Sequence, residues 1–212
     1  MKTSPMIVTL IDYMGSDLSV VNAARVSFHK ESSSFQEQDA KLISYLAKHK
    51  HTSPFNHCFI SVRVKAPIFV ARQLVKHKFL PWNEVSRRYV DEEPEFYITE
   101  VWRAKVDNVK QGSGGPLEKY DFNFMRGIFD ALDLYKEMLK EGVCAEQARM
   151  VLPQNTMTEW IWSGSLGAFA DMLRLRLHSH TQAETRQVAQ KIKALIEPLF
   201  PVSLSALLGE QE

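Results

Sequence analysis

The ten residues HCFISVRVKA, positions 57–66, constrain the fold of this chain most, because apolar side chains occupy every second position. Successive side chains of a β-strand point to opposite faces, so this period of two predicts a strand with one apolar and one mixed face. The apolar face would carry Cys58, Ile60, Val62, Val64 and Ala66. Such a strand suits a sheet that helices cover on one side, while the other side is partly open or covered by another subunit.

Hydrophobic spacing and turn residues predict the remaining elements along the chain. Short strands are expected at 6–11 and 95–98, helices at 19–28, 36–50, 67–78, 120–139, 144–152, 165–178 and 181–196, and loops at 82–90 and 107–116. Two capping-box patterns, Thr156 with Glu159 and Thr181 with Glu184, predict helix starts. Together these elements predict an α+β fold, in which a mainly antiparallel sheet packs with a larger helical part.

Composition limits the function classes that the chain can belong to. Its 212 residues, 45% of them hydrophobic, support one sizeable core, so we expect a single domain over residues 1–212. The net charge of +1 argues against a nucleic-acid-binding protein, which would carry a strong basic excess. No run approaches the roughly 20 apolar residues of a membrane span. The N-terminus also lacks a signal-peptide pattern, and we expect a cytoplasmic protein without membrane contact.

The cysteines and histidines do not form the clusters that disulfide frameworks or metal sites require. Cys58 and Cys144 are isolated, and we expect both to be buried as small apolar side chains in a reducing compartment. His49, His51 and His57 are not spaced for one helix face, and no acid or cysteine completes a ligand set. We therefore predict no metal site.

A basic run, ARQLVKHKFLPWNEVSRRY at residues 71–89, carries six basic side chains. Arg72 and Lys76 are four residues apart and would share a helix face, where like charges cost stability unless an anion or an acid relieves them. By composition alone, a phosphate site and a solvated basic helix explain this run equally well. The downstream half adds a hydroxyl, a carboxylate and further guanidinium groups, and this inventory suits a nucleoside monophosphate.

The order of residues in this run resembles the signature of flavin-dependent thymidylate synthases, which has the form RHR, seven residues and then serine. Here the sequence is KHK at residues 76–78, seven residues and then Ser86. Further segments resemble the family in the same order: NAARVSF (22–28), HTSPFNH (51–57), KAPIFVARQ (65–73), EQARMVLP (146–153) and LRLHSHTQAE (175–184). The resemblance therefore covers nearly the whole chain.

This resemblance implies an enzyme that makes dTMP from dUMP, with 5,10-methylenetetrahydrofolate as carbon donor, NADPH as reductant and FAD between them. Matched positions imply that dUMP is bound by Gln73, Lys76, Glu84, Val85, Ser86, Arg87, Arg88, Arg149 and Arg176. They imply that FAD is bound by Ser27, Ser53, Lys76, His77, Lys78, Glu84, Ser165, Asp171 and His180. Arg176 would be catalytic, since an arginine at the N3–carbonyl edge of uracil stabilises negative charge that develops on the ring.

The family resemblance also implies a homotetramer whose active sites draw on several subunits. Neither Cys58 nor Cys144 matches a family site position. Because reduced flavin supplies the hydride, the reaction requires no cysteine nucleophile.

The chain departs from the family pattern at positions that the resemblance assigns to flavin. Lys76 and Lys78 stand in place of two arginines and keep the charge but not the planar fork of guanidinium. Ser165, Gly167 and Asp171 stand where many members have asparagine, arginine and asparagine. Losing a basic group and gaining an acid near flavin phosphates predicts weaker or rearranged FAD binding. An alternative interpretation is a flavin- or nucleotide-binding homologue that has lost synthase activity.

Overall fold

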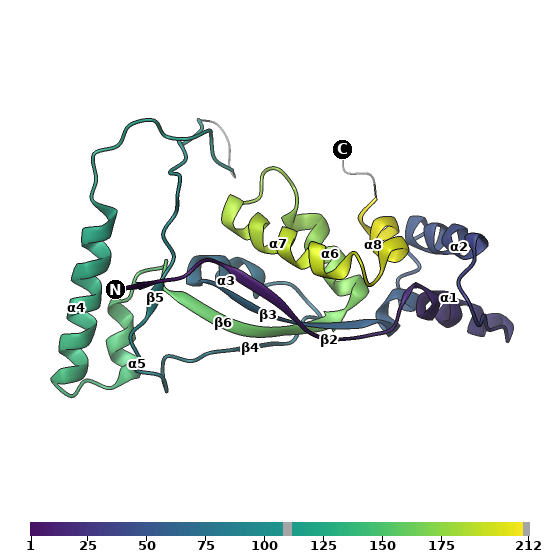
Figure 1. Ribbon diagram of the computed structural model, residues 1–212, viewed down its shortest axis with the longest axis horizontal. Helices are drawn as coiled ribbons and strands as arrows, with labels where there is room; N and C mark the ends of the chain where they lie inside the picture. The colour runs from purple at the N-terminus through teal and green to yellow at the C-terminus, as the bar shows by residue number, and fades with distance from the viewer. Residues whose placement is uncertain (108–111, 210–212) are drawn as a thin grey trace.

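The computed structural model describes residues 1–107 and 112–209 and is built around a four-stranded antiparallel sheet (Figure 1). The strands follow the order β2 (Ile7–Met14), β3 (Phe59–Pro67), β6 (Met157–Ser165) and β4 (Trp82–Glu84). A separate parallel pair joins β1 (Lys2–Thr3) to β5 (Glu95–Phe96). The expected α+β class and the mainly antiparallel sheet are confirmed.

Helices cover one face and both ends of this sheet, as Figure 1 shows. They are α1 (Asp17–Arg25), α2 (Glu37–Lys48), α3 (Ile68–Leu74), α4 (Phe124–Lys140), α5 (Ala145–Ala148), α6 (Leu166–Arg176), α7 (Ala183–Ile196) and α8 (Pro201–Leu208), with 3₁₀ turns η1 (Val26–Phe28), η2 (Ser53–His57) and η3 (Arg149–Val151). Among the described residues, no helix combines the length and apolar character needed to cross a bilayer.

The alternation in β3 has the predicted consequence for packing. Ile60, Val62 and Val64 are fully buried in the main core beneath α6 and α7, whereas Phe59 and Arg63 on the opposite face are exposed. The prediction of one covered face is therefore confirmed. The other face of the sheet is open in the single chain.

The largest error of the sequence interpretation concerns β6, where Thr156 and Glu159 predicted a helix start. Thr156 instead donates its hydroxyl to the Pro153 carbonyl at 2.7 Å, which closes a turn before the strand. Trp160 and Trp162 then lie on the covered face, paired with Val64 and Val62 of β3. The period of two in these aromatic residues outweighed the local capping pattern, because the strand pairs on both sides.

Several predicted boundaries also shift, with consequences for the basic run. α3 ends at Leu74 and not near residue 78, so Arg72 and Lys76 do not share a helix face. Residues 82–84 form the edge strand β4 inside a segment predicted as loop. Of the loop predicted at 107–116, residues 108–111 lie outside the described residues.

The ends of the later helices differ from prediction for local reasons. α4 begins at Phe124 because the Asn123 side chain accepts a hydrogen bond from the Arg126 amide, at 3.0 Å, and caps the helix. Thr181 does not cap α7; its hydroxyl donates to the Leu175 carbonyl, and Gln182 is the N-cap residue. α8 was not predicted. Cys58 is buried as expected, but Cys144 is exposed at the start of α5, which contradicts the expected burial.

Gly164 in β6 lies directly against Phe79 and Leu80, which leave no room for a side chain. Its replacement by alanine is therefore expected to destabilise the protein. An added Cβ would lie 2.3 Å from Leu80 Cδ2 and 3.0 Å from the Phe79 carbonyl oxygen. Such overpacking costs about 1–3 kcal/mol. Urea unfolding measures the effect, and Gly127→Ala is the matched control, because its Cβ meets nothing within 4 Å on the exposed side of α4. Equal stability of the two variants would contradict the prediction.

Candidate active site

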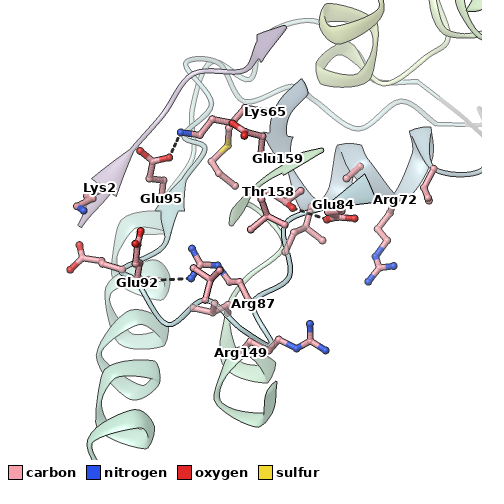
Figure 2. Close-up of a pocket in the computed structure, with 18 residues that line it drawn as sticks. Lys2, Lys65, Arg72, Glu84, Arg87, Glu92, Glu95, Arg149, Thr158 and Glu159 are labelled. Atoms are coloured by element: carbon pink, nitrogen blue, oxygen red, sulfur yellow. Dashed lines mark hydrogen bonds and ion pairs between the residues drawn. The ribbon is translucent and has the colours of Figure 1, made fainter. Parts of the chain in front are cut away.

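A cavity of about 490 Å³ lies beside β4, between α3 and η3 (Figure 2). Arginines from three different segments line it, namely Arg72 of α3, Arg87 of the loop after β4 and Arg149 of η3. We call it the arginine-lined cavity. Glu92 and Glu95 lie toward its other end.

None of the three arginines has a counter-ion in the part of the chain that the structure describes. The ion pairs found there do not include Arg72, Arg87 or Arg149. Arg149 Nε donates to the Glu146 carbonyl at 3.2 Å, and Arg87 Nη1 donates to the Glu92 carbonyl at 2.9 Å. Backbone contacts therefore orient two guanidinium groups without neutralising them. Such an arrangement suits an anion with several oxygen acceptors, such as a phosphate.

Glu84 places a fixed carboxylate on the wall of the same cavity. One of its oxygens accepts a hydrogen bond from Thr158 Oγ1 at 2.7 Å, and the other accepts from Trp82 Nε1 at 3.0 Å. Trp82 in turn stacks on Trp160, with ring centroids 4.2 Å apart. The edge strand, paired with β6, thus holds the carboxylate in one orientation. A carboxylate fixed in this way can accept from a sugar hydroxyl or a base N–H.

The structure separates the residues that were predicted to bind dUMP into two groups. Those that line the arginine-lined cavity are Glu84, Val85, Arg87 and Arg149. Those that lie outside it are Gln73, Lys76, Ser86, Arg88 and Arg176. The Ser86 hydroxyl accepts from the Arg88 amide at 3.3 Å, and Arg88 reaches Glu146 at 3.6 Å on an exposed loop.

Two further residues of this cavity, Arg72 and Thr158, are not among those that the resemblance assigned to dUMP. Arg72 belongs to the basic run, but the resemblance selected its neighbour Gln73. The Arg72 side chain lines the cavity (Figure 2), whereas Gln73 lies outside the lining and its side-chain amide donates to the Gln182 side chain. Thr158 carried no signal, because its segment was read as a helix start and not as a strand.

Two residues of the basic run form hydrogen bonds with the Arg176 side chain. Its Nε donates to His77 Nε2 at 2.9 Å, and its Nη2 donates to the Gln73 carbonyl at 2.9 Å. The His77 ring lies 6.3 Å from the ring of Trp162. Burial lowers the pKa of the Arg176 guanidinium from its ordinary value. The contacts join Arg176 to two predicted site residues that precede it by 99 and 103 positions.

The His77–Arg176 contact is expected to make stability depend on pH. Burial, and secondarily the Arg176 charge, lowers the pKa of His77 from 6.5 to about 4. Between these values the unfolded chain binds more protons than the folded chain, so stability falls as pH drops from about 6.5 to 4. After allowance for partial exposure, we expect a loss on the order of 2 kcal/mol. Urea unfolding at pH 7 and pH 4.5 tests this. The His77→Gln variant should lose that part of the pH dependence, and an unchanged difference between the two pH values would contradict the prediction.

A second cavity, of about 910 Å³, lies at the start of α6 and is bounded by α2, η2 and the end of α8. We call it the α6 cavity. It contains two residues predicted to bind FAD, Ser165 and Asp171. Ser53 lies in η2, next to cavity residue Thr52, and Lys78 precedes cavity residue Phe79.

The remaining residues predicted to bind flavin are not gathered at the α6 cavity in one chain. Ser27, Lys76 and His180 are exposed and lie outside its lining, and His77 contacts Arg176. Glu84 belongs to the arginine-lined cavity. Among the described residues, no group of three or more His, Cys, Asp or Glu side chains could hold a metal ion.

Comparison with known proteins places the chain in a family. The family model described as thymidylate synthase complementing protein matches residues 9–202. The flavin-dependent thymidylate synthase of Thermus thermophilus is 40% identical over 201 residues, which cover 94% of this chain and 74% of that protein. The chain belongs to the flavin-dependent thymidylate synthase family. The enzyme of that name from Thermotoga neapolitana is 38% identical, covering 95% of this chain and 90% of the relative. The family resemblance found in the sequence is thus confirmed.

Two solved structures of one protein also match this chain over nearly its whole length. The UMP/dUMP methylase PolB from Streptomyces cacaoi, bound with 5-Br dUMP, superposes with a TM-score of 0.88 at 32% identity. The alignment covers 97% of this chain and 96% of that one. The same methylase bound with 5-Br UMP gives a TM-score of 0.83 at 30% identity.

Proposed function

We propose that this family member catalyses the flavin-dependent reductive methylation of dUMP to dTMP. The observation that carries the proposal is the arginine-lined cavity, whose lining combines arginines from three separate segments with the fixed carboxylate of Glu84. Arg72, Arg87 and Arg149 would bind the phosphate, while Glu84 would bind the sugar or base edge. Relatives named flavin-dependent thymidylate synthase and a neighbour named dUMP methylase support the same chemistry.

The residues of the α6 cavity fit a flavin nucleotide. At about 910 Å³ the cavity is within the usual size range of ligand sites, roughly 300–1,000 Å³. Phe59 and Phe79 offer ring surfaces, and Lys50 and Arg174 offer positive charge. When bound, FAD would carry reducing equivalents to the one-carbon unit on the uracil ring. NADPH as reductant and 5,10-methylenetetrahydrofolate as carbon donor complete the proposed reaction.

Arg176 is proposed as the residue that polarises uracil. Carbon addition at C5 requires electron density there, and a guanidinium at the N3–carbonyl edge stabilises the negative charge that results. His77 and the Gln73 carbonyl orient this guanidinium and leave some of its five N–H donors free. Neither Cys58, buried under α1, nor exposed Cys144 is needed as a nucleophile.

We propose that the enzyme works as a homotetramer with shared active sites. Ile7, Phe59 and Ile161 are each about 40% exposed on the open face of the sheet. A partner covering this face would bury them. Shared sites would also bring the exposed Ser86 loop of one chain to the Arg176 of another. Light scattering in solution measures the assembly, and a monomeric active enzyme would rule it out. We also propose that residues 1–212 act as a single domain.

One observation favours UMP as a second substrate, since the structural neighbour is named a UMP/dUMP methylase. Specificity constants for dUMP and UMP, measured with the same enzyme preparation, would separate the two. A constant for UMP within tenfold of that for dUMP would make the chain a dual-specificity methylase.

The deciding experiment is formation of dTMP from dUMP, methylenetetrahydrofolate and NADPH under anaerobic conditions with added FAD. The proposal expects dTMP together with oxidation of NADPH. Absence of product, while dUMP and FAD both bind, would instead support a nucleotide-binding homologue without synthase activity.

A further inference from the structure

The α6 cavity has a positively charged wall whose residues were not among the predicted flavin ligands. Lys50, two residues after the end of α2, and Arg174, in the last turn of α6, both line it. Asp171 is the only carboxylate among the residues described as lining this cavity. The lining therefore carries more cations than carboxylates.

Arg174 is fixed at the rim of the cavity between two helices. Its Nη1 pairs with Asp171 Oδ1 at 2.9 Å, and its Nη2 donates to the Leu207 carbonyl of α8 at 2.7 Å. These contacts use two of the five N–H donors of a guanidinium. The others remain available for a ligand with oxygen acceptors, such as a phosphate.

Gly167 lies on the same face of α6 as Arg174, and the space beside it is occupied. Gly167, Asp171 and Arg174 follow at spacings of four and three residues, so they share one face of α6. A Cβ at Gly167 would lie 2.5 Å from Asn56 Oδ1, and this oxygen accepts from the Ser165 hydroxyl at 2.7 Å. The Asn56 side chain thus occupies the space that a long side chain at 167 would need. Arg174 is the cation that the same helix face supplies two turns later.

The turn at residues 78–80 adds an aromatic surface to the cavity. Phe79 is 85% exposed and has a φ of 61°, in the left-handed region that bulky residues rarely adopt. Such conformations cluster at functional sites, where the surrounding structure holds them. Phe59 is 40% exposed on the same cavity. Aromatic surfaces beside fixed cations suit a planar ring that is joined to phosphate groups.

We propose that Arg174, together with Lys50, binds the phosphate groups of the flavin nucleotide in this enzyme. The inference rests on the proposed function, because it takes the ligand of the α6 cavity to be flavin. In this proposal, Arg174 supplies the positive charge that many family members carry at the position of Gly167. Asp171 then competes with the phosphates for Arg174.

Titration of flavin fluorescence with FAD, FMN and riboflavin tests this assignment. Arg174→Gln is expected to raise the Kd for FAD and FMN about 10- to 100-fold, which matches a hydrogen bond to a charged group. The Kd for riboflavin, which has no phosphate, should stay unchanged. Asp171→Asn should lower the Kd for FAD. Arg126→Gln is the matched control, because Arg126 also pairs with an acid on its own helix, Asp130, on the exposed side of α4.

Each outcome of the titration has a distinct meaning. FAD binding by Arg174→Gln with the wild-type Kd would overturn the inference. An equal loss of FAD and riboflavin, with altered circular dichroism, would show a structural role and would also overturn it. Failure of the wild-type chain to bind any flavin or to form dTMP would refute the proposed function itself, which distinguishes the two failures.

Discussion

Arg176→Lys is expected to lower kcat for dTMP formation by about 100-fold or more, with a much smaller change in the KM for dUMP. The reason is geometric. Two different nitrogens of the planar guanidinium, Nε and Nη2, donate the hydrogen bonds that orient Arg176. A lysine ammonium keeps the charge but cannot hold His77 and Gln73 while donating to uracil. Removing one preorganised donor to developing negative charge costs about 10²–10³ in kcat.

Single-turnover kinetics with preloaded reduced enzyme measure this effect on the chemical step. Lys193→Met, a half-exposed position on α7, serves as the control and should retain wild-type kcat. His77→Asn should show an intermediate loss, because it removes the acceptor for Arg176 Nε without removing the guanidinium. Wild-type kcat in Arg176→Lys would remove Arg176 from the mechanism.

Sequence reasoning succeeded where a long pattern and its tertiary role agree. The alternation from Cys58 to Ala66 predicted both the strand and its buried face, because apolar residues recur with a period of two when one face of a strand is buried. The spacing in α6, α7 and α2 likewise predicted helices within a few residues of their bounds. These elements form the scaffold on which both cavities are built.

Sequence reasoning failed where short local signals compete with pairing between distant strands. The capping pattern at Thr156 suggested a helix, although Trp160 and Trp162 pair with β3, almost one hundred residues earlier. The same error hid the edge strand β4, which needs β6 as its neighbour, and with it the support that Thr158 gives to Glu84. Local pattern contains no information about which strand lies next to which.

The candidate site residues show the same contrast between what a motif predicts and what the tertiary arrangement adds. The resemblance assigned Arg149, Glu84 and Arg176 to one dUMP site from matched motifs, whereas in the single chain only Arg149 and Glu84 line the same cavity. The basic run made Arg72 a phosphate candidate through its charge alone, and Arg174 carried no signal, because a family motif describes shared positions. Both are proposed as ligands because of the cavities that they line.

Arg149→Leu is expected to raise the Kd for dUMP about 10- to 100-fold, while binding of deoxyuridine, which lacks the phosphate, stays unchanged. Arg149 has no ion-pair partner among the described residues, and its Nε contact with the Glu146 carbonyl orients a guanidinium that lines the cavity. A hydrogen bond to a charged group contributes about 1.5–3 kcal/mol, which sets the size of the effect.

Isothermal titration of both ligands separates phosphate binding from base recognition. Arg72→Leu should produce a loss of the same kind, because Arg72 reaches the same cavity from α3. Lys140→Leu, at the exposed end of α4, removes a cation remote from the cavity and should leave both affinities unchanged. An equal loss of dUMP and deoxyuridine affinity in Arg149→Leu would show that the arginine supports the shape of the site and does not bind phosphate. If Arg149→Leu binds dUMP with the wild-type Kd, the phosphate does not bind in the arginine-lined cavity.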